Sequence, residues 1–569
     1  MNNLEIAKIF RNFAKILEIK QDNPFRIRAY ERAAQNIEAL TENIEDYLKE
    51  ERLRDIAGIG KDLAEKIKEF INTGKIQAYE DLKRTIPSGL LDLLDIPSVG
   101  PKTVKLLYEK LGIKNVQDLE NAIKEKRLQG IFGIKEKTID NILKGIAILK
   151  KGRERMTLAE AIKIQAEFTE ALKKLPEVKR ISVAGSLRRQ KETVRDIDIL
   201  VVSDHSKKVM DTFSQLPSVK EILAKGETKS SVRTKEGVQV DCRVVPDKSF
   251  GAALLYFTGS KNFNIKLRQL AINKGLKINE YGVFRKEKFL VGKSEEEIFR
   301  FLGMSYIEPE LREDSGEIEL ALKRKLPSLI ELRDIKGDLH IHSQWSDGAN
   351  TIEDLVTFAR QMGYTYIAIT DHSQSLKVAG GLGLKELEKK KRQIDKLNKE
   401  LKDFRILYAT EVDIDSQGRL DYPDEVLKEF DIVVAAIHTG FKQSSAQLTK
   451  RIVSACRNKY VHIIAHPTGR LWGVRDVYPI DLEEVFRVAK DTHTHLEINA
   501  FWQRLDLNDL NCRRAKEMGV KLALGTDAHT SEQLASMNLG IAVARRGWLE
   551  KKDVINTLSA EELLKAIKK

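Results

Sequence analysis

Two separate groups of side chains on this chain have the types and spacing of metal ligands. The first contains only carboxylates: Asp196 and Asp198 lie two residues apart, and Asp241 follows later. The second is rich in histidine and extends toward the C-terminus; it comprises His340, His342, Asp347, His372, Glu411, His438, His466, Asp527 and His529. Oxygen ligands alone suit Mg²⁺, whereas imidazole ligands suit Zn²⁺ or Mn²⁺. Both kinds of site act on phosphate esters, so the chain is predicted to carry two chemistries for one substrate.

The three carboxylates are expected on two neighbouring strands. Apolar residues alternate over 197–201 and 238–245, as they do in strands, so Asp196 and Asp198 share one face and Asp241 joins them when the strands pair. Converging carboxylates repel one another unless cations lie between them. Two Mg²⁺ ions roughly 3.5–4 Å apart would activate a primer 3′-oxygen and stabilise the leaving pyrophosphate.

A turn upstream of these carboxylates is predicted to hold phosphate. Ser186 and Arg189, which follow Gly185, would bind the β- and γ-phosphates of a nucleotide through the turn backbone and a guanidinium. An isolated Asp-x-Asp pair is common on protein surfaces. Together with the turn and the arginine, it indicates a nucleotidyltransferase.

The histidine-rich group follows short predicted strands. His340 and His342 alternate on one of them, and His438, His466 and Asp527 come after apolar runs. Strands and helices alternate from residue 337 onward, which predicts a β/α barrel, and such a barrel builds its active face at the strand C-termini. The remaining histidines are expected to be structural or exposed: His205, His462, His493 and His495.

Residues 1 to about 150 are predicted to be helical and to contact DNA. Ile56–Lys61 and Ile96–Lys102 are glycine-containing turns that precede helices, where backbone N–H groups approach a phosphate. One such loop fits an ordinary helix–helix turn equally well, but two in a basic chain favour contact with the DNA backbone. A third candidate, Gly130–Lys135, has altered glycine spacing. The predicted DNA-binding residues are Gly58, Gly60, Lys61, Gly100 and Lys102.

Composition sets the outer bounds. The chain has 569 residues, enough for about three or four domains, and 42% hydrophobic residues. A net charge of +13 and a pI near 9.2 favour a polyanionic partner, nucleic acid rather than membrane. The three cysteines show no paired spacing, the N-terminus has no signal-peptide pattern, and no apolar run is long enough to span a membrane. A cytoplasmic location is expected.

The first 312 or so residues resemble the family X DNA polymerases, of which DNA polymerase beta is the best known. The matching segments are Ala29–Ala34, Gly58–Ile67, Lys225–Lys229, Tyr256–Ser260 and Ile278–Tyr281. The resemblance implies that Tyr256, Phe257 and Gly259 lie under the incoming nucleotide sugar. It also implies that Asn264 and Arg268 contact the base edge and the template minor groove.

Lys66 matches the lysine that forms a Schiff base with an abasic sugar in that family. A lysine needs a depressed pKa to act as a nucleophile. Asp62 stands where the beta member of the family has a basic phosphate contact, and this departure puts lyase activity in question.

The histidine-rich half resembles the PHP (polymerase and histidinol phosphatase) domain, a barrel with up to three metal ions, here expected to be Mn²⁺ or Zn²⁺. The resemblance implies one ion held by His340, His342, Glu411 and Asp527. It implies a second held by Glu411, His438 and His466 and a third held by Asp347, His372 and His529. The expected activities are 3′–5′ exonuclease and cleavage at abasic sites. Asn499, Arg504 and Asp506 match a segment near the metal face.

The predicted architecture is multidomain: an all-α helix-hairpin-helix region, an α+β nucleotidyltransferase palm and thumb, and a distorted β/α barrel. The expected boundaries are a helical lyase-like domain at 1–84, a helix-hairpin-helix subdomain at 85–152, a palm at 153–247, a nucleotide-binding thumb-type subdomain at 248–312, a linker at 313–335 and a PHP domain at 336–569.

The predicted function is a repair polymerase that fills short gaps and carries a PHP nuclease. Gapped or primer-template DNA and deoxynucleoside triphosphates are the expected partners, and no membrane is. Two alternatives remain: a polymerase whose PHP domain is only structural, and a scaffold that binds DNA ends. The two sites share no ligand, so we expect them to act independently.

Overall fold

The computed structural model describes residues 2–39, 44–56, 58–87, 89–94, 96, 99–129, 131, 134, 136, 138–140, 142–143, 146, 155–472, 475 and 477–569. The third candidate DNA-binding turn, Gly130–Lys135, lies largely outside these ranges. The chain divides into two compact units: residues 1–155 with 265–277, and residues 156–264 with 278–569. Each is described by itself.

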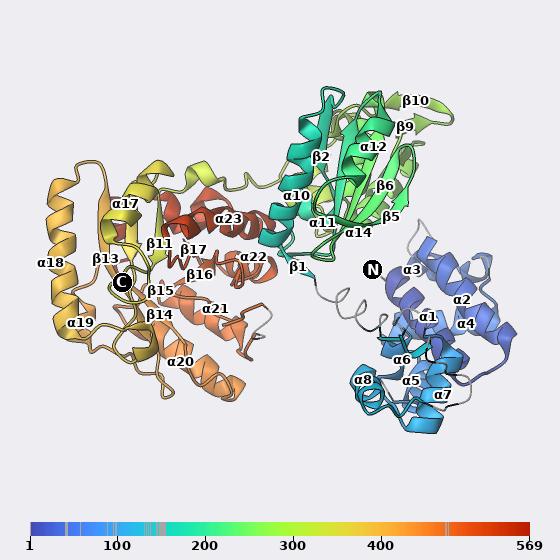
Figure 1. Ribbon diagram of the computed structural model, residues 1–569, viewed down its shortest axis with the longest axis horizontal. Coiled ribbons are helices and arrows are strands. Elements are labelled where there is room, and N and C mark those ends of the chain that lie inside the picture. The colour runs from blue at the N-terminus through green and yellow to red at the C-terminus, as the bar shows by residue number, and fades with distance from the viewer. Residues whose placement is uncertain are drawn as a thin grey trace. The chain divides into compact units, whose positions relative to one another are not determined.

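The first unit is helical, as the sequence predicts (Figure 1). Its helices pack on two apolar cores, one built around residues such as Phe13 and Tyr30, whose rings stack at 4.1 Å. The described elements are α1 (Asn2–Ile19), α2 (Pro24–Ala39), α3 (Ile44–Lys49), α4 (Lys61–Thr73), α5 (Gln77–Arg84), α6 (Leu90–Leu93), α7 (Pro101–Leu111) and α8 (Val116–Lys124).

The second unit begins with a five-stranded mixed sheet in the order β2-β4-β7-β6-β5. Only the central pair, β4 and β7, is parallel; the other neighbours are antiparallel. Ile197 and Ile199 of β4 are buried. Because side chains alternate along a strand, Asp196 and Asp198 point to the opposite face. The strands are β2 (Arg180–Val183), β4 (Asp196–Val202), β5 (Val219–Lys225), β6 (Lys229–Thr234) and β7 (Gln239–Val245).

Helices and two smaller sheets surround this mixed sheet. The helices are α10 (Leu158–Lys173), α11 (Gly185–Arg188), α12 (Ser206–Ser214), α13 (Phe250–Thr258) and α15 (Glu295–Phe301). A further helix, α14 (Lys261–Asn273), runs across the boundary, and its residues from 265 onward belong to the first unit. The first small sheet pairs β1 (Met156–Thr157) with β3 (Thr193–Val194). The second contains β8 (Lys277–Asn279), β9 (Gly282–Arg285) and β10 (Lys288–Val291).

The stretch expected to be a charged linker is folded and packed. It contains α16 (Glu317–Leu322), and the side chains of Arg312 and Glu317 are fully buried. Arg312 pairs with Glu295 at 2.6 Å, and the Glu317 carboxylate accepts backbone N–H bonds from Asp314 and Ser315. The buried charge of Glu317 is therefore satisfied by hydrogen bonds within this stretch.

Seven parallel strands in sequential order form the C-terminal barrel. Hydrogen bonds also join the first strand of the barrel to the last strand and the residues after it. Asp527 N–H donates to His340 O at 2.9 Å, and Asn556 Nδ2 donates to the carbonyls of Gly337 and Leu524. The strands are β11 (Gly337–Ile341), β12 (Tyr366–Ile369), β13 (Arg405–Asp413), β14 (Ile432–Ala436), β15 (Ile463–Ile464), β16 (His495–Asn499) and β17 (Leu522–Gly525).

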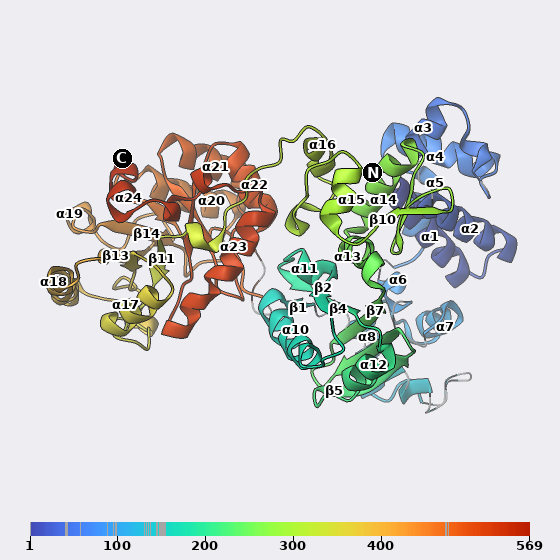
Figure 2. The same cartoon turned by 90° about the horizontal axis from the view of Figure 1, so that it is seen from above.

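Helices lie around these strands (Figure 2). They are α17 (Ile352–Gln361), α18 (Leu384–Glu400), α19 (Asp424–Leu427), α20 (Ser445–Arg457), α21 (Leu482–Asp491), α22 (Asp509–Glu517), α23 (Met537–Arg546) and α24 (Ala560–Ala566). Within the described ranges, no helix combines the length and apolar character needed to cross a membrane.

Candidate active sites

The carboxylate site lies on the two parallel strands at the centre of the mixed sheet. Asp198 of β4 is the direct register partner of Asp241 of β7, and Asp196 sits two residues earlier on the exposed end of β4. Burial and then the charges of Asp196 and Asp241 raise the pKa of Asp198 to about 7. The repulsion expected from the sequence is therefore present, and divalent cations would relieve it.

Gly185 places the phosphate-binding turn against these carboxylates. Its φ is +64°, and a Cβ added there would lie 2.6 Å from Asp198 Oδ2, so a side chain has neither a relaxed backbone nor space. Ser186 follows directly in α11. The turn and the metal ligands therefore share one site.

Arg189 is fixed by two contacts. Its Nε donates to Glu313 Oε1 at 3.0 Å, and its Nη1 donates to the Thr258 carbonyl. A Cβ at Gly259 would lie 3.1 Å from that Nη1, so the turn matched to the nucleotide sugar abuts the guanidinium.

The other predicted nucleotide contacts lie on α13 and α14. Tyr256 is partly exposed, and its carbonyl accepts a 2.7 Å hydrogen bond from Asn264 Nδ2. Arg268 follows Asn264 by one turn of α14, and the Arg243 guanidinium lies 4.4 Å from the centroid of Phe257.

Sequence reasoning missed a buried ion cluster beside this site. Glu295 accepts hydrogen bonds from Arg188 at 2.6 Å and from Arg312 at 2.6 Å. Burial alone would raise the pKa of Glu295, but the two guanidinium groups lower it to about 2. Arg188 is next to Arg189, so this cluster anchors the helical turn from which Arg189 extends. Its partners lie far apart in sequence, and no local pattern predicts the pairing.

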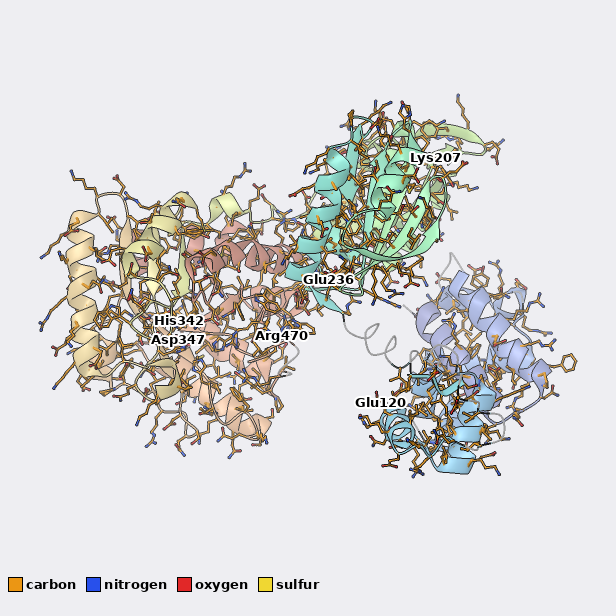
Figure 3. The ribbon with its side chains drawn as sticks, viewed as in Figure 1. Glu120, Lys207, Glu236, His342, Asp347 and Arg470 are labelled. Carbon is orange, nitrogen blue, oxygen red and sulfur yellow. The ribbon has the colours of Figure 1, made fainter. Side chains whose placement is uncertain are left out.

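The nine predicted ligands of the histidine-rich site converge at one end of the barrel, where Figure 3 shows His342 and Asp347 side by side. Within the described part of the chain, the compact ligand clusters all lie here. They are His342 with Asp347, His372 and His529; His340 with His342 and Asp527; and His372 with Glu411 and His438. His342 and His372 thus each join two clusters, whereas the resemblance assigned each to one ion. Glu411 Oε1 is also 3.0 Å from His466 Nε2.

These residues fit bound cations. The Nε2 atoms of His340 and His342 lie 3.1 Å apart, and the Nδ1 atoms of His342 and His466 are buried without a hydrogen-bond partner. Burial would lower the pKa of His372, but the Glu411 carboxylate raises it to about 10. Metal ions would replace the protons that these carboxylates attract.

Two carboxylates outside the predicted set orient the ligands. Glu497 Oε1 lies 2.6 Å from His340 Nδ1, and Asp413 Oδ1 lies 2.7 Å from His438 Nδ1. Such partners fix the tautomer and ring orientation of a ligating histidine. Asp413 follows Glu411 by two residues on β13, so strand alternation was a usable signal for it. Glu497 carried no comparable signal.

A cavity of about 290 Å³ opens over the cluster; it is lined by Asp347, His372, Leu376, Ala379, Glu411, His438, His466, Phe501, Arg504, Asp527, His529 and Gln533. Arg504 Nε donates to Asp527 at 3.1 Å, as does Asn499 Nδ2. Asp506 instead accepts two bonds from Thr468, is fully buried and does not line the cavity.

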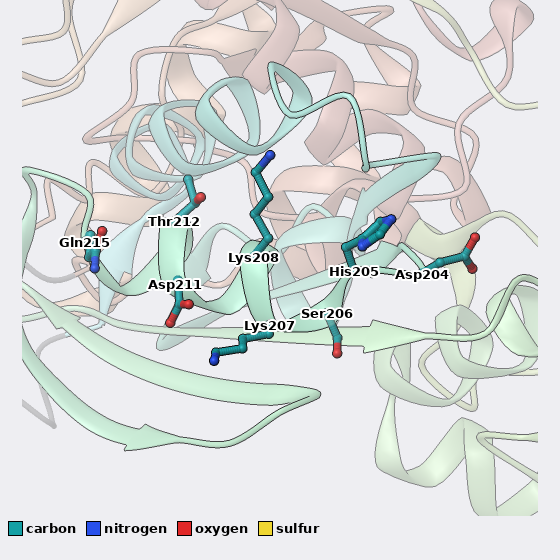
Figure 4. A pocket seen from close by; sticks show the side chains of 8 residues that line it. All are labelled: Asp204, His205, Ser206, Lys207, Lys208, Asp211, Thr212 and Gln215. Atoms are coloured by element: carbon teal, nitrogen blue, oxygen red, sulfur yellow. The ribbon is translucent and has the colours of Figure 1, made fainter.

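The second hollow, along α12, contains none of the predicted site residues (Figure 4). Its charged groups are largely paired with neighbours: Asp211 with Lys225 at 2.6 Å and Lys208 with Glu177 at 2.5 Å. We assign it no ligand.

The two glycine turns of the helical unit begin helices with open backbone. Gly60 and Gly100 are the N-caps of α4 and α7, and a Cβ at either position would meet nothing within 4 Å. Gly58 has a φ of +82°. Lys61 and Lys102 lie exposed in the first turns of the two helices. Phosphate could reach the first N–H groups of both helices.

Lys66 is held in a salt bridge. Its Nζ lies 2.5 Å from Asp62 Oδ1, one helical turn earlier. This is the spacing of an ordinary ion pair between neighbouring turns of a helix. The geometry favours an ionic role for Lys66.

Four family models match the chain. They are a helix-hairpin-helix domain at residues 1–76, a SAM-like helix-hairpin-helix tandem at 90–147, the DNA polymerase beta thumb at 253–313 and a PHP domain at 338–500. The PHP match contains seven of the nine predicted barrel ligands, and Asp527 and His529 lie beyond it. The seven are His340, His342, Asp347, His372, Glu411, His438 and His466.

Curated relatives cover the whole chain or its C-terminal part. The chain is 40% identical over 567 residues to the DNA polymerase/3′-5′ exonuclease PolX of Bacillus subtilis (strain 168), covering 99% of both chains. It is 34% identical over 235 residues to a probable phosphatase of Thermoanaerobacter sp. (strain X514), which covers 39% of this chain and 89% of that protein. The domains imply metal dependence and DNA and nucleotide substrates. The protein belongs to the family X DNA polymerases that carry a C-terminal PHP domain.

Proposed function

We propose that this polymerase fills short gaps in DNA during repair and that its barrel removes nucleotides from DNA 3′ ends. The observation that carries the proposal is the pairing of Asp198 with Asp241 directly beside the Gly185 turn. That arrangement brings metal ligands and a phosphate-binding turn to one place, as nucleotidyl transfer requires.

In the mixed-sheet site, Asp196, Asp198 and Asp241 would hold two Mg²⁺ ions, which supply Lewis acidity toward the reacting oxygens when bound. Ser186 and Arg189 hold the triphosphate and orient it for in-line attack. Tyr256, Phe257 and Gly259 form the floor under the sugar. Asn264 and Arg268, on one face of α14, contact the base edge and the template.

In the barrel, the nine ligands would hold up to three Mn²⁺ or Zn²⁺ ions, which polarise a phosphodiester and lower the pKa of water when bound. Glu497 and Asp413 keep His340 and His438 in the ligating tautomer. Arg504, next to Asp527, offers a cation for the scissile phosphate. The cavity over the cluster would seat the terminal nucleotide.

The helical unit would grip the DNA backbone on either side of a gap. Gly58, Gly60 and Lys61 form one contact, and Gly100 and Lys102 form the other, each through N–H groups at a helix start. Such contacts read phosphates rather than bases, which suits repair at any sequence.

Two substitutions test the assignment. Each variant is incubated with labelled, gapped DNA in Mg²⁺ and then in Mn²⁺, with and without nucleotides. His342→Ala should stop degradation while extension continues and its products lengthen. Asp196→Ala should stop extension while degradation continues. If folded His342→Ala also fails to extend primers, the division of labour between the two sites is wrong.

A further inference from the structure

The barrel contacts the nucleotide-binding side of the mixed sheet through buried charges. Arg546, at the end of α23, is 4% exposed in its side chain. Its Nη1 donates to the Arg189 carbonyl at 2.8 Å and to Glu313 Oε1 at 3.1 Å. Asp509 of α22 holds the other edge of the guanidinium, at 2.6 Å from Nη2. Arg546 is therefore anchored within the barrel and reaches outward.

Arg546 Nη1 donates to Glu313 Oε1, to the Arg189 carbonyl and, at 3.3 Å, to the Glu310 carbonyl. The two shorter contacts both involve Arg189. Glu313 Oε1 accepts from Arg546 and also from Arg189 Nε, so one carboxylate oxygen joins the two arginines. The acceptor of the other short contact is the backbone of Arg189 itself. Arg546 thus fixes Arg189 at its main chain and, through Glu313, at its guanidinium.

A second contact between the barrel and this part of the chain lies at Glu192, just before β3. Arg470, labelled in Figure 3, forms a paired contact with Glu192 at 3.1 and 2.6 Å and donates to the carbonyls of Arg504 and Leu505. The barrel therefore contacts this part of the chain at Arg189 and again three residues later at Glu192. A flexible linker alone would not impose this register.

We propose that Arg546 of the barrel is a positioning residue for nucleotide addition: through Glu313 and the Arg189 carbonyl, it holds the triphosphate-binding arginine in place. The inference rests on the proposed role of Arg189 in binding the nucleotide triphosphate. It assigns the barrel a part in polymerisation that needs none of its metal ligands.

Arg189 would contact the triphosphate both before and during transfer, so loosening it removes uniform binding and raises KM more than it lowers kcat. A charge-assisted bond lost from a buried network corresponds to a rise in KM of about 5- to 30-fold.

Full-length variants are assayed for single-nucleotide insertion on a one-nucleotide gap, with 3′–5′ degradation of single-stranded DNA as the measure of an intact barrel. Arg546→Ala should raise the nucleotide KM by about 5- to 30-fold with kcat within a few-fold of the parent. Arg546→Lys should recover part of the loss, because an ammonium reaches fewer of the acceptors. Glu313→Gln should shift KM in the same direction and guards against misfolding of Arg546→Ala.

The matched control is Arg545→Ala. Arg545 neighbours Arg546 on α23 and also crosses the junction, but it pairs with Glu310 at 2.7 Å and donates to the Ile330 carbonyl instead of to Arg189 or Glu313. Its loss should leave KM unchanged. An equal rise in KM for Arg545→Ala would show that any damage to the junction suffices and would overturn the specific role of Arg546.

Arg189→Ala distinguishes the proposed role of Arg189 in nucleotide binding from the proposed positioning role of Arg546. If it leaves KM unchanged, the proposed role of Arg189 fails. If it raises KM while Arg546→Ala and Glu313→Gln do not, only the positioning inference is overturned. If both hold, the double variant Arg189→Ala/Arg546→Ala should be no worse than Arg189→Ala alone, because the second loss acts through the first.

Discussion

The two metal sites are held by the fold in different ways. Asp196 is exposed and its partners are only half-buried, whereas His340, His342 and Glu411 of the barrel are at most 1% exposed. His340 and His438 are each oriented by a carboxylate hydrogen-bonded to Nδ1, from Glu497 and Asp413 respectively. The carboxylates of the mixed sheet are positioned by the register of β4 and β7. We expect the exposed carboxylate site of the mixed sheet to receive its cations with each nucleotide. We expect the buried, preoriented barrel site to retain its ions.

The difference extends to the backbone. His466 and Asp527 adopt φ values of +29° and +54°, in the left-handed region that residues with side chains seldom occupy. Such conformations persist where surrounding structure determines them, and they gather at functional sites. Asp196 and Asp198 lie in a regular strand. The ligands of the barrel are thus positioned by unusual backbone conformations and hydrogen bonds, whereas the carboxylates of the mixed sheet are positioned by regular strand geometry.

The largest effect should follow from Asp241→Ala. The change removes a ligand that Asp198 cannot replace, so gap filling should fall below detection, while affinity for gapped DNA and 3′–5′ degradation stay close to those of the parent protein. Primer extension, a binding titration and degradation are measured on one preparation. Asp247→Ala, a surface change just after the same strand, is the control. Extension at a comparable rate by Asp241→Ala would remove the mixed sheet from the catalytic role.

A smaller but still large effect is expected on stability from Glu295→Gln. The change leaves two buried guanidinium groups with a weaker partner, at a cost of about 3–5 kcal/mol. Because the folded pKa of Glu295 lies near 2, below that of a free glutamate, its contribution is present above about pH 4.5 and is lost as the pH falls toward 2.

Denaturant midpoints of the parent and Glu295→Gln should therefore differ most at pH 7, and the difference should shrink below about pH 4.5 and be smallest near pH 2. Glu296→Gln, an exposed neighbour on α15, serves as the control and should match the parent throughout. Equal midpoints at pH 7 would mean that the ion cluster does not support the nucleotide side.

Removing the carboxylates behind the barrel ligands should weaken metal retention. Glu497→Gln and Asp413→Asn should each lower metal affinity by about 10- to 100-fold, without changing the ligands themselves. Metal content is measured after dialysis against graded chelator. Asp415→Asn is the matched control, since Asp415 pairs with Arg419 rather than with a ligand. Retention equal to that of the parent would falsify the view that the barrel is preoriented for its ions.

Local sequence patterns predicted individual strands and the fold class, but they did not predict contacts between residues far apart in the sequence. Strand alternation around Ile197 predicted that Asp196 and Asp198 share a face, and the apolar run at 366–369 coincides with β12. The fold class is confirmed by the helical unit, the thumb and the PHP barrel. What escaped is long-range pairing: Glu295 with Arg188, Glu313 with Arg546, and the packing of the stretch expected to be a linker. Spacing along the chain carries no information about such partners.

The smallest effect concerns the DNA grip, where a third kind of preorganisation is predicted. Gly60 and Gly100 open onto space, so valine at either position should leave the helices intact but push a phosphate away from the first N–H groups. Affinity for gapped DNA should fall by about 3- to 10-fold for each, with alanine giving less. Circular dichroism checks the helices, and binding is titrated against salt. Since the glycine contacts act through backbone dipoles rather than through lysine charges, the salt slope should stay near that of the parent while the affinity falls. Affinity unchanged at every salt concentration would mean that these turns only join helices, and the grip on DNA would have to lie elsewhere.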